Sequence, residues 1–340
     1  MIHHVAVDGV SWRVLVPDLI AAWAQIRDGG LPELPPVGTS FRRWAHGLKE
    51  MAESRADEFT LWEDMIQGDE PILGSRALDP VVDVNRTLKR ATFEITPNAT
   101  ETLLTTVPEV LRGGVDDGLI ASLVLALARW KGATTPLIGL EGHGREEAAV
   151  PGADVSRTLG WFTTIAPVRF DASYVDIADA FSGGEDAGVV LKSVKEQLRS
   201  VPDRGVGFGM LRYLHSDGAA RLGAANPQVM FNYLGRFVTG EVPEGLRELG
   251  WMPADDSDEM MFTFAPDMAA PGALDITAMI SPSDAGQVLQ VVVLYPSGLF
   301  ADAEISEFTE HWKAALGAVC DYAQSPVAGA LHHPMWAWST

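Results

Sequence analysis

The 340-residue chain is acidic, and its composition excludes several classes of protein. It carries 46 Asp and Glu against 25 Lys and Arg, which gives a formal net charge of −21 at pH 7. This balance argues against nucleic acid or an anionic membrane as a partner, because phosphate binding needs clustered cations. Hydrophobic residues make up 47% of the chain, so a sizeable core is available to a globular protein.

The cysteine content and the apolar stretches indicate the cellular compartment in which the protein is expected. Cys320 is the only cysteine, which excludes an intrachain disulfide and a thiolate metal cluster and fits a reducing, cytoplasmic location. The first residues lack a basic flank followed by an apolar run, so we expect no signal peptide. The most apolar stretch, residues 119–130, is too short to span a bilayer.

The first quarter of the chain predicts two helices and a linker. Apolar residues recur at helical spacing from Leu15 to Ile26, and Gly29-Gly30 ends that helix. A second amphipathic helix is expected after the capping residue Ser40, with an apolar face formed by Phe41, Trp44, Ala45, Leu48 and Met51. Residues 68–85 are rich in Asp, Pro and Gly and lack periodicity. They predict a boundary between a first lobe at 1–88 and a second at 89–325, before a tail at 326–340.

The rest of the chain mixes strands with helices. Alternation around Phe93 and Ile95 predicts a half-buried strand. Further strands are expected at residues 137–140, 229–231, 274–280 and 289–294. Residues 119–130 predict a central helix that is apolar on nearly every side, and a helical stripe runs from Ile305 to Val319. Since strict βαβ alternation is absent, the fold class predicted is α+β or mixed α/β.

The first candidate for chemistry is the string His3-His4-x-x-x-Asp8-Gly9. An imidazole is a natural proton-transfer group near neutral pH. We expect an extended segment in which His3 and His4 point to opposite faces, so that one of them can face a given cavity. Asp8 can pair with a cation, and Gly9 permits backbone geometry that other residues resist. The helix that follows could stabilise negative charge at its N-terminus. A pair of structural histidines is the alternative interpretation.

The second candidate is the string Glu141-Gly142-His143-Gly144-Arg145-Glu146. Glycines flank the histidine at the end of a predicted strand, an arrangement that carries polar groups into a cleft. His143 with the two glutamates would suggest a metal site, but the ligand geometry has no independent support, so no metal is expected. Glu141 is better placed as a carboxylate base or acid, because burial would raise its pKa.

Three further segments contain residues that could take part in a site. Arg157 could pair with Asp8 or with a carboxylate of the site, or lie on the surface. Glycines in residues 205–213 resemble a phosphate loop superficially, but no clear strand precedes them, so a dinucleotide site is not expected. Asn232 and Tyr233 place an amide and a phenol at a strand end, where Tyr233 could equally be a core aromatic.

Taken in order, these segments resemble the signature motifs of epimerisation domains of non-ribosomal peptide synthetases, within the larger condensation-domain family. They are residues 3–13, 141–146, 157–163, 205–213 and 231–235. The His-His-x-x-x-Asp-Gly string also fits condensation domains and chloramphenicol-acetyltransferase-like acyltransferases. The strings Glu-Gly-His-Gly-Arg-Glu and Phe-Asn-Tyr-Leu-Gly favour epimerisation. The resemblance runs from residue 3 to Phe300 or nearby.

The resemblance implies a mixed α/β fold of two chloramphenicol-acetyltransferase-like lobes in a V, with the active site between them. In the family the His-His motif comes well after the start of the first lobe, so the first lobe is expected to be incomplete here. No intrinsic cofactor is implied. The substrate would arrive on the 4'-phosphopantetheine of a peptidyl carrier domain, and neighbouring synthetase modules would be the other partners. His332-His333, in the tail, is expected to have no role.

The implied reaction converts a carrier-bound L-aminoacyl or peptidyl thioester to the D form. Glu141 and His4 would face the α-carbon from opposite sides of the site, and Tyr233 would donate or relay a proton. Six residues would support these three, through enolate orientation (Asn232 and the helix N-terminus near Ser11), through a structural ion pair (Asp8 with Arg157), or as members of the first motif (His3 and Gly9).

Two other functions remain open from the sequence. A condensation domain, which forms amide bonds between two carrier-bound substrates, would use His4 in a similar way but gives Glu141 and Tyr233 no clear purpose. An inactive fragment that only docks carrier domains is the third interpretation. The expected incomplete first lobe favours it, whereas the presence of His4, Glu141 and Tyr233 together counts against it.

Overall fold

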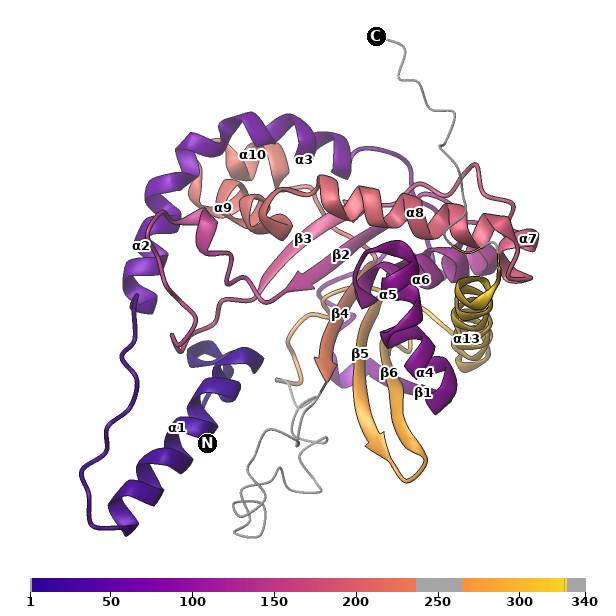
Figure 1. The fold of residues 1–340 in the computed structure, drawn as a ribbon. Coiled ribbons are helices and arrows are strands. Elements are labelled where there is room, and N and C mark those ends of the chain that lie inside the picture. Colours follow the sequence, from indigo (N-terminus) through magenta and orange to yellow (C-terminus); the bar gives the residue numbers. More distant parts are fainter. Residues whose placement is uncertain (1, 237–264, 327, 329–340) are drawn as a thin grey trace.

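The structure, a computed structural model, describes residues 2–236, 265–326 and 328, and its centre is one six-stranded mixed sheet. The strands lie in the order β1-β6-β5-β4-β2-β3 (Figure 1). Their bounds are Leu88–Ile95 (β1), Leu137–Gly142 (β2), Thr164–Arg169 (β3), Val229–Arg236 (β4), Leu274–Ser283 (β5) and Gly286–Pro296 (β6). β4 runs parallel to both β2 and β5, and the other neighbouring pairs are antiparallel. The predicted mixed α/β class is confirmed.

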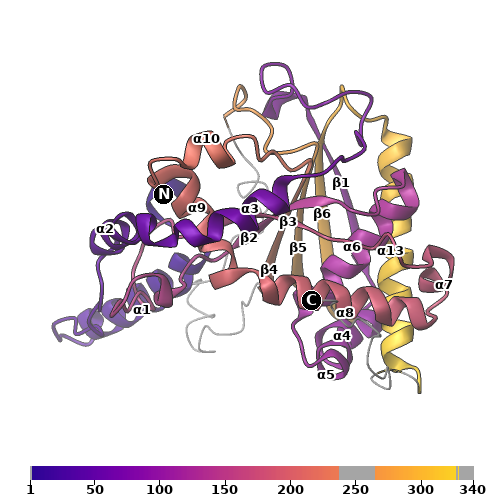
Figure 2. The same ribbon diagram turned by 90° about the horizontal axis from the view of Figure 1, so that it is seen from above.

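Helices cover one face of this sheet and bury its apolar residues. The two long ones are α6 (Val115–Lys131) and α13 (Asp302–Gln324), which lie side by side along the sheet in Figure 2. Trp312 of α13 contacts Phe93 and Phe231, with ring centroids 5.6 and 6.3 Å apart. Since side chains alternate along a strand, the residues next to Phe93 and Phe231 point to the opposite face. Four shorter helices extend the cover, namely α4 (Pro97–Leu104), α5 (Thr106–Leu111), α7 (Ile177–Phe181) and α8 (Glu185–Ser200).

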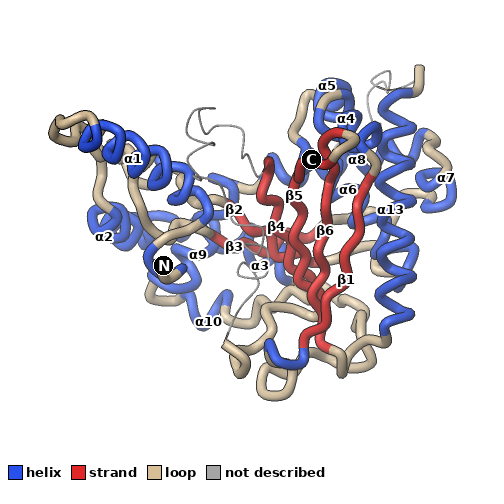
Figure 3. The backbone as a smooth tube through the Cα atoms, turned by 90° about the horizontal axis from the view of Figure 1, so that it is seen from below, coloured by secondary structure: helices blue, strands red, loops and turns tan. Residues whose placement is uncertain are grey.

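The first part of the chain forms helices that lie on the side of the edge strand β3 (Figures 2 and 3). The three α-helices are α1 (Gly9–Arg27), α2 (Phe41–Ala52) and α3 (Phe59–Ile66). Ser40 caps α2 as predicted, since its side chain accepts a hydrogen bond of 3.2 Å from the Arg43 amide. In the same region lie α9 (Val206–Leu214), α10 (Gly218–Leu222) and the 3₁₀ helices η1 (His4–Ala6), η2 (Glu53–Glu58), η4 (Glu147–Ala149) and η5 (Pro202–Gly205). The remaining 3₁₀ helix, η3 (Asn85–Thr87), directly precedes β1 at the opposite edge of the sheet.

The start of the chain differs from its predicted conformation. The extended segment expected at the His-His pair is wrong, because η1 begins at His4. The His3 ring Nδ1 accepts a hydrogen bond of 3.1 Å from the Val5 amide, and this cap closes a helical turn. The lobe boundary near residue 88 stays a prediction, although Phe59 and Trp62 of α3 belong to the same buried core as the sheet.

Within the described ranges, none of the helices combines the length and the apolar character needed to cross a membrane. His332-His333 and most of the expected tail lie outside the described residues.

Candidate active site

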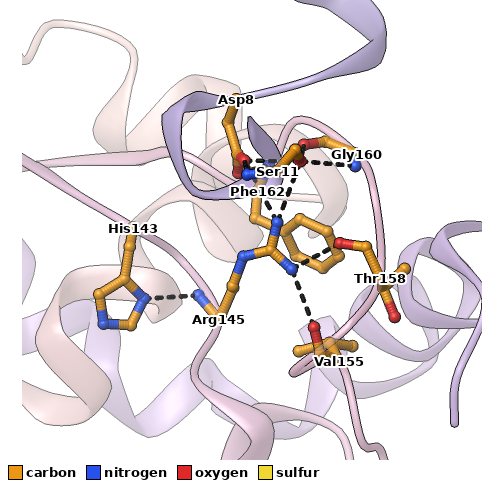
Figure 4. A network of polar contacts seen from close by, with 8 residues as sticks. All are labelled: Asp8, Ser11, His143, Arg145, Val155, Thr158, Gly160 and Phe162. Atoms are coloured by element: carbon orange, nitrogen blue, oxygen red, sulfur yellow. Dashed lines mark hydrogen bonds and ion pairs between the residues drawn. The ribbon is translucent and has the colours of Figure 1, made fainter. Parts of the chain in front are cut away.

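The N-terminus of α1 is built around the buried carboxylate of Asp8, which is 2% exposed. Asp8 caps the helix by accepting hydrogen bonds of 2.7 Å from both the amide and the hydroxyl of Ser11. Its other oxygen accepts a bond of 3.1 Å from the Phe162 amide, far along the chain. The Ser11 hydroxyl also lies 2.9 Å from the Gly160 carbonyl oxygen. The cap therefore joins α1 to the loop that precedes β3 (Figure 4).

Arg145 completes this junction from the loop after β2. Its guanidinium lies 4.0 Å from the centre of the Phe162 ring and is nearly buried. Its Nη atoms donate hydrogen bonds to the carbonyls of Val155 (2.8 Å) and Thr158 (2.6 Å), to Asp8 (3.2 Å) and to the Ser11 hydroxyl (3.2 Å). Removing one partner of such a buried, hydrogen-bonded ion pair strongly destabilises the protein, because the other charge is left buried and unpaired. Arg145 thus connects three segments that are distant in sequence.

The pKa of the Asp8 carboxyl is lowered, although its burial acts in the opposite direction. Desolvation favours the protonated form, but the hydrogen bonds from Ser11 and Phe162 and the charge of Arg145 outweigh it. Asp8 therefore stays ionised within the junction at neutral pH.

The predicted ion pair between Asp8 and Arg157 is wrong. Arg157 instead donates hydrogen bonds of 2.6 and 2.8 Å to the two carboxylate oxygens of Asp18, in the middle of α1. The reason is geometric: the Asp8 carboxylate is already enclosed by the first turn of α1 and by Arg145. Both arginines link α1 to the segment before β3, but at different points along the helix.

Sequence reasoning missed the role of Arg145. Arg145 belongs to the Glu141–Glu146 string, so the sequence contained a signal for its importance. Nothing in the sequence indicates that its partner is Asp8. Gly144, beside it, has φ of 65°, and a Cβ there would collide with the Phe162 carbonyl oxygen. Glycine is required at this position because the loop passes directly against the segment that Arg145 binds.

Gly9 and Ser11 do not have the roles expected from the sequence. Gly9 begins α1 without a positive φ, so its predicted backbone freedom is not used. Ser11 is fully buried, and its hydroxyl is occupied by Asp8, Gly160 and Arg145. Its contacts support the junction rather than an open ligand site.

His3 and His4 are both exposed at the start of the chain. The His4 ring packs against the half-exposed Trp161 ring, with centroids 5.0 Å apart and planes tilted by 52°. Trp161 stands between Gly160 and Phe162, the two residues that bond the Asp8 cap. The junction therefore positions the Trp161 ring against which the His4 ring packs. In the described part of the chain His4 has no hydrogen bond or ion pair to Glu141.

Glu141 lies near the end of β2, on the sheet face opposite α6 and α13. The parallel register pairs Leu140 with Phe231, so the next residues along, Glu141 and Asn232, are neighbours. The Asn232 side chain is hydrogen-bonded to the Glu141 carboxyl. This arrangement brings two of the predicted site residues together, from strings that are far apart in sequence.

The pKa of Glu141 is raised to about 7. Glu141 is an exposed residue, yet the protein close to its carboxyl desolvates it, and this desolvation is the main cause. The carboxyl of Asp275 on β5 acts in the same direction, and the bond with Asn232 opposes both. A carboxyl with such a pKa can take up and return a proton near neutral pH.

Tyr233 follows Asn232 on β4 and pairs with the fully buried Ala278 of β5. Its ring packs against the main hydrophobic core, on the sheet face covered by helices. The structure therefore does not bring the Tyr233 ring to the face that carries Glu141.

His143 lies 3.5 Å from Glu146, and both side chains are partly exposed. In the described parts of the chain, no group of three or more His, Cys, Asp and Glu side chains is arranged to hold a metal ion.

Comparison with known proteins identifies relatives along nearly the whole chain. The family model described as "Condensation domain" matches residues 1–331. One of the linear gramicidin synthase proteins of Brevibacillus parabrevis is 35% identical over 332 residues, which are 96% of this chain and 4% of that protein. Surfactin synthase subunit 1 of Bacillus subtilis (strain 168) is 32% identical over 334 residues, which are 95% of this chain and 9% of that protein.

A solved structure is also similar. The epimerization domain from the third module of tyrocidine synthetase B superposes with a TM-score of 0.76 and 28% identity, covering 95% of this chain and 68% of that one. The chain therefore belongs to the condensation-domain family, and it spans a small part of the length of the curated relatives it matches.

Proposed function

We propose that the chain is an epimerisation domain, which converts an L-aminoacyl or peptidyl thioester to the D form. The observation that carries the proposal is the Glu141 carboxyl, held by Asn232 on the side of the sheet away from the covering helices, with a pKa of about 7. Efficient acid–base catalysis needs a group whose pKa lies near the working pH. The similarity to a solved epimerization domain supports the same reaction.

In the proposed reaction the Glu141 carboxylate takes the α-proton of the substrate. The electrons of the broken C–H bond move into the thioester carbonyl and form an enolate. A proton is then returned to the α-carbon on the opposite face, and the exposed His4 ring is the proposed donor. Tyr233 is not assigned a direct part, because its ring packs into the core on the other face of the sheet.

The proposed substrate is carried on the 4'-phosphopantetheine of a peptidyl carrier domain. The curated relatives are synthase proteins of which the matched region is a small fraction, and this supports carrier domains and neighbouring modules as partners. No intrinsic cofactor is needed for the proposed chemistry, because the thioester carbonyl itself accepts the negative charge. A cytoplasmic location is proposed with it.

The test is the exchange of α-deuterium from an L-aminoacyl pantetheine loaded on a carrier domain, together with the yield of D product. Glu141→Gln keeps the shape and the bond to Asn232 but cannot accept a proton. We expect it to lower the exchange rate by about 100-fold or more. Glu94→Gln on the edge strand β1 is the matched control, since it removes an exposed carboxylate from the same sheet.

Retained exchange in Glu141→Gln would exclude Glu141 as the base. If the unaltered chain exchanges no α-deuterium but forms an amide between two loaded carriers, condensation is the function instead. The assay should be repeated with a longer chain that matches the full length of the solved epimerization domain, since the present chain covers 68% of it.

A further inference from the structure

A second carboxyl lies on the same face of the sheet as Glu141. Asp275 of β5 pairs with Met230 of β4, which in turn pairs with Gly139 of β2. Glu141 is two residues beyond Gly139, so its side chain points to the same face as that of Asp275. The two carboxyl-bearing strands are two positions apart in the sheet, about 10 Å at the usual strand spacing.

The face between the two carboxyls carries the apolar Met230 and the polar Asn232 on β4. Met230 is buried, and its sulfur lies directly over Gly139, where a Cβ would approach it to 2.5 Å. On the direct line between the two acids β4 thus presents Met230 beside Asp275 and Asn232 beside Glu141, and Asn232 is hydrogen-bonded to the Glu141 carboxyl. A charge is screened less over such a surface than over water.

The other charged groups of this face lie farther away. In register with Asp275, the next strands carry Leu294 on β6 and then Arg90 on the edge strand β1. Glu94 is also on β1, and it is exposed. On the other side, β3 places Ile165 opposite Glu141, and Arg169 at its far end bonds the carbonyls of Met65 and Thr135. From other elements, Arg13 of α1 donates a hydrogen bond to the Leu234 carbonyl on β4, and Arg204 of η5 lies 3.7 Å from Glu146. Among the described residues, the charge that raises the pKa of Glu141 is that of Asp275, two strands away.

We propose that Asp275 is a positioning residue for the proton transfer at Glu141, and that its negative charge keeps Glu141 protonated up to neutral pH. This inference rests on the proposed function, in which Glu141 is the base. Removing the charge of Asp275 would leave Glu141 ionised at lower pH, so the enzyme would stay active in more acidic solution.

The pKa values support the direction of the effect. Burial raises the pKa of Asp275 to about 6, so it is mostly ionised at pH 7. Desolvation and then the Asp275 charge raise the pKa of Glu141 to about 7. Asp275→Asn removes the second of these causes, so the pKa of Glu141 should fall. Two strand spacings across the sheet and two residues along it put the two Cα atoms about 12 Å apart. At intermediate dielectric the shift should be roughly 0.5–1 pH unit.

The experiment is the pH dependence of kcat/KM for α-deuterium exchange. In Asp275→Asn the acid limb should move down by roughly 0.5–1 pH unit, and Asp275→Glu should restore the original profile. Glu94→Gln removes the same charge at the edge of the sheet and should leave the acid limb in place. An unmoved acid limb in Asp275→Asn, or an equal movement in Glu94→Gln, would overturn the proposal. Asp275→Ser replaces Asp275→Asn if the latter does not fold.

A second readout separates this inference from the proposed function. The Glu141 carboxyl can be titrated by NMR in protein labelled with ¹³C-glutamate, and its signal is identified by its loss in Glu141→Gln. The midpoint should be lower in Asp275→Asn than in the unaltered protein. If the unaltered protein exchanges no α-deuterium, the proposed function fails, while an unchanged midpoint would reject the role of Asp275 by itself.

Discussion

Helices α1 and α6 have apolar residues in abundance, yet they are held in the molecule by different means. α6 is buried almost continuously from Asp117 to Ala128. In α1 the buried residues are Ser11 and Ile20, while Leu19 and Ile26 are more than half exposed. α6 is therefore stabilised by packing, and the polar contacts of α1 are concentrated at its first turn and at Asp18.

The two halves of the candidate site differ in the same way, since one depends on core packing and the other on polar contacts. Glu141 and Asn232 lie on strands of the sheet that α6 and α13 support. His4 precedes α1, and its place depends on the junction of Asp8 with Arg145 and on Trp161. Because polar junctions of this kind fail when one partner is lost, His4 should be the part of the site that is more easily displaced.

The largest effect on stability is expected from the core helix. Leu125→Ala in α6 removes a fully buried side chain and should lower the free energy of unfolding by about 4 kcal/mol, through lost burial and the cavity left behind. Leu19→Ala in α1 is the matched variant, because it makes the same substitution at an exposed position. It should change the free energy of unfolding by less than about 0.5 kcal/mol. Urea unfolding measures both. Similar losses in the two variants would mean that α1 is packed as tightly as α6.

A smaller and more local effect is expected at the junction. Arg145→Ala leaves the Asp8 carboxylate buried without its cation, which should cost about 3 kcal/mol of local stability. Hydrogen exchange should show faster exchange at the Ser11 and Phe162 amides, which donate to Asp8. The amides of α6 are the internal control and should be protected as before. Unchanged exchange at Ser11 would show that Asp8 holds α1 without Arg145.

The smallest effect is expected from the second ion pair. Arg157 and Asp18 are each roughly a quarter to a third exposed, so Arg157→Ala should cost less than about 1 kcal/mol. Salt should reduce the difference between this variant and the unaltered protein, since partly exposed charges are screened. A loss as large as that of Arg145→Ala would show that the position along α1, rather than burial, decides the strength of each link.

Local patterns predict many of the elements because their causes lie within a few residues. Ser40 caps α2 through the amide three residues on, and the apolar run at 119–130 is inside α6. Alternation around Phe93 and Ile95 predicts β1. The prediction for His3-His4 is wrong because a ring nitrogen bonding to the Val5 amide closes a turn, and no periodicity reveals such a contact.

The sequence by itself determined the mixed α/β class, most of the strands, and the strings of residues that hold Asp8, Glu141 and Asn232. Only the tertiary structure decided which partners they have. In the folded chain Asp8 pairs with Arg145 and not with Arg157, and Asn232 lies beside Glu141. The Tyr233 ring lies on the sheet face that the helices cover. The physical reason is that strand order and register bring distant segments together, and a shift of one residue would reverse which side chains share a face.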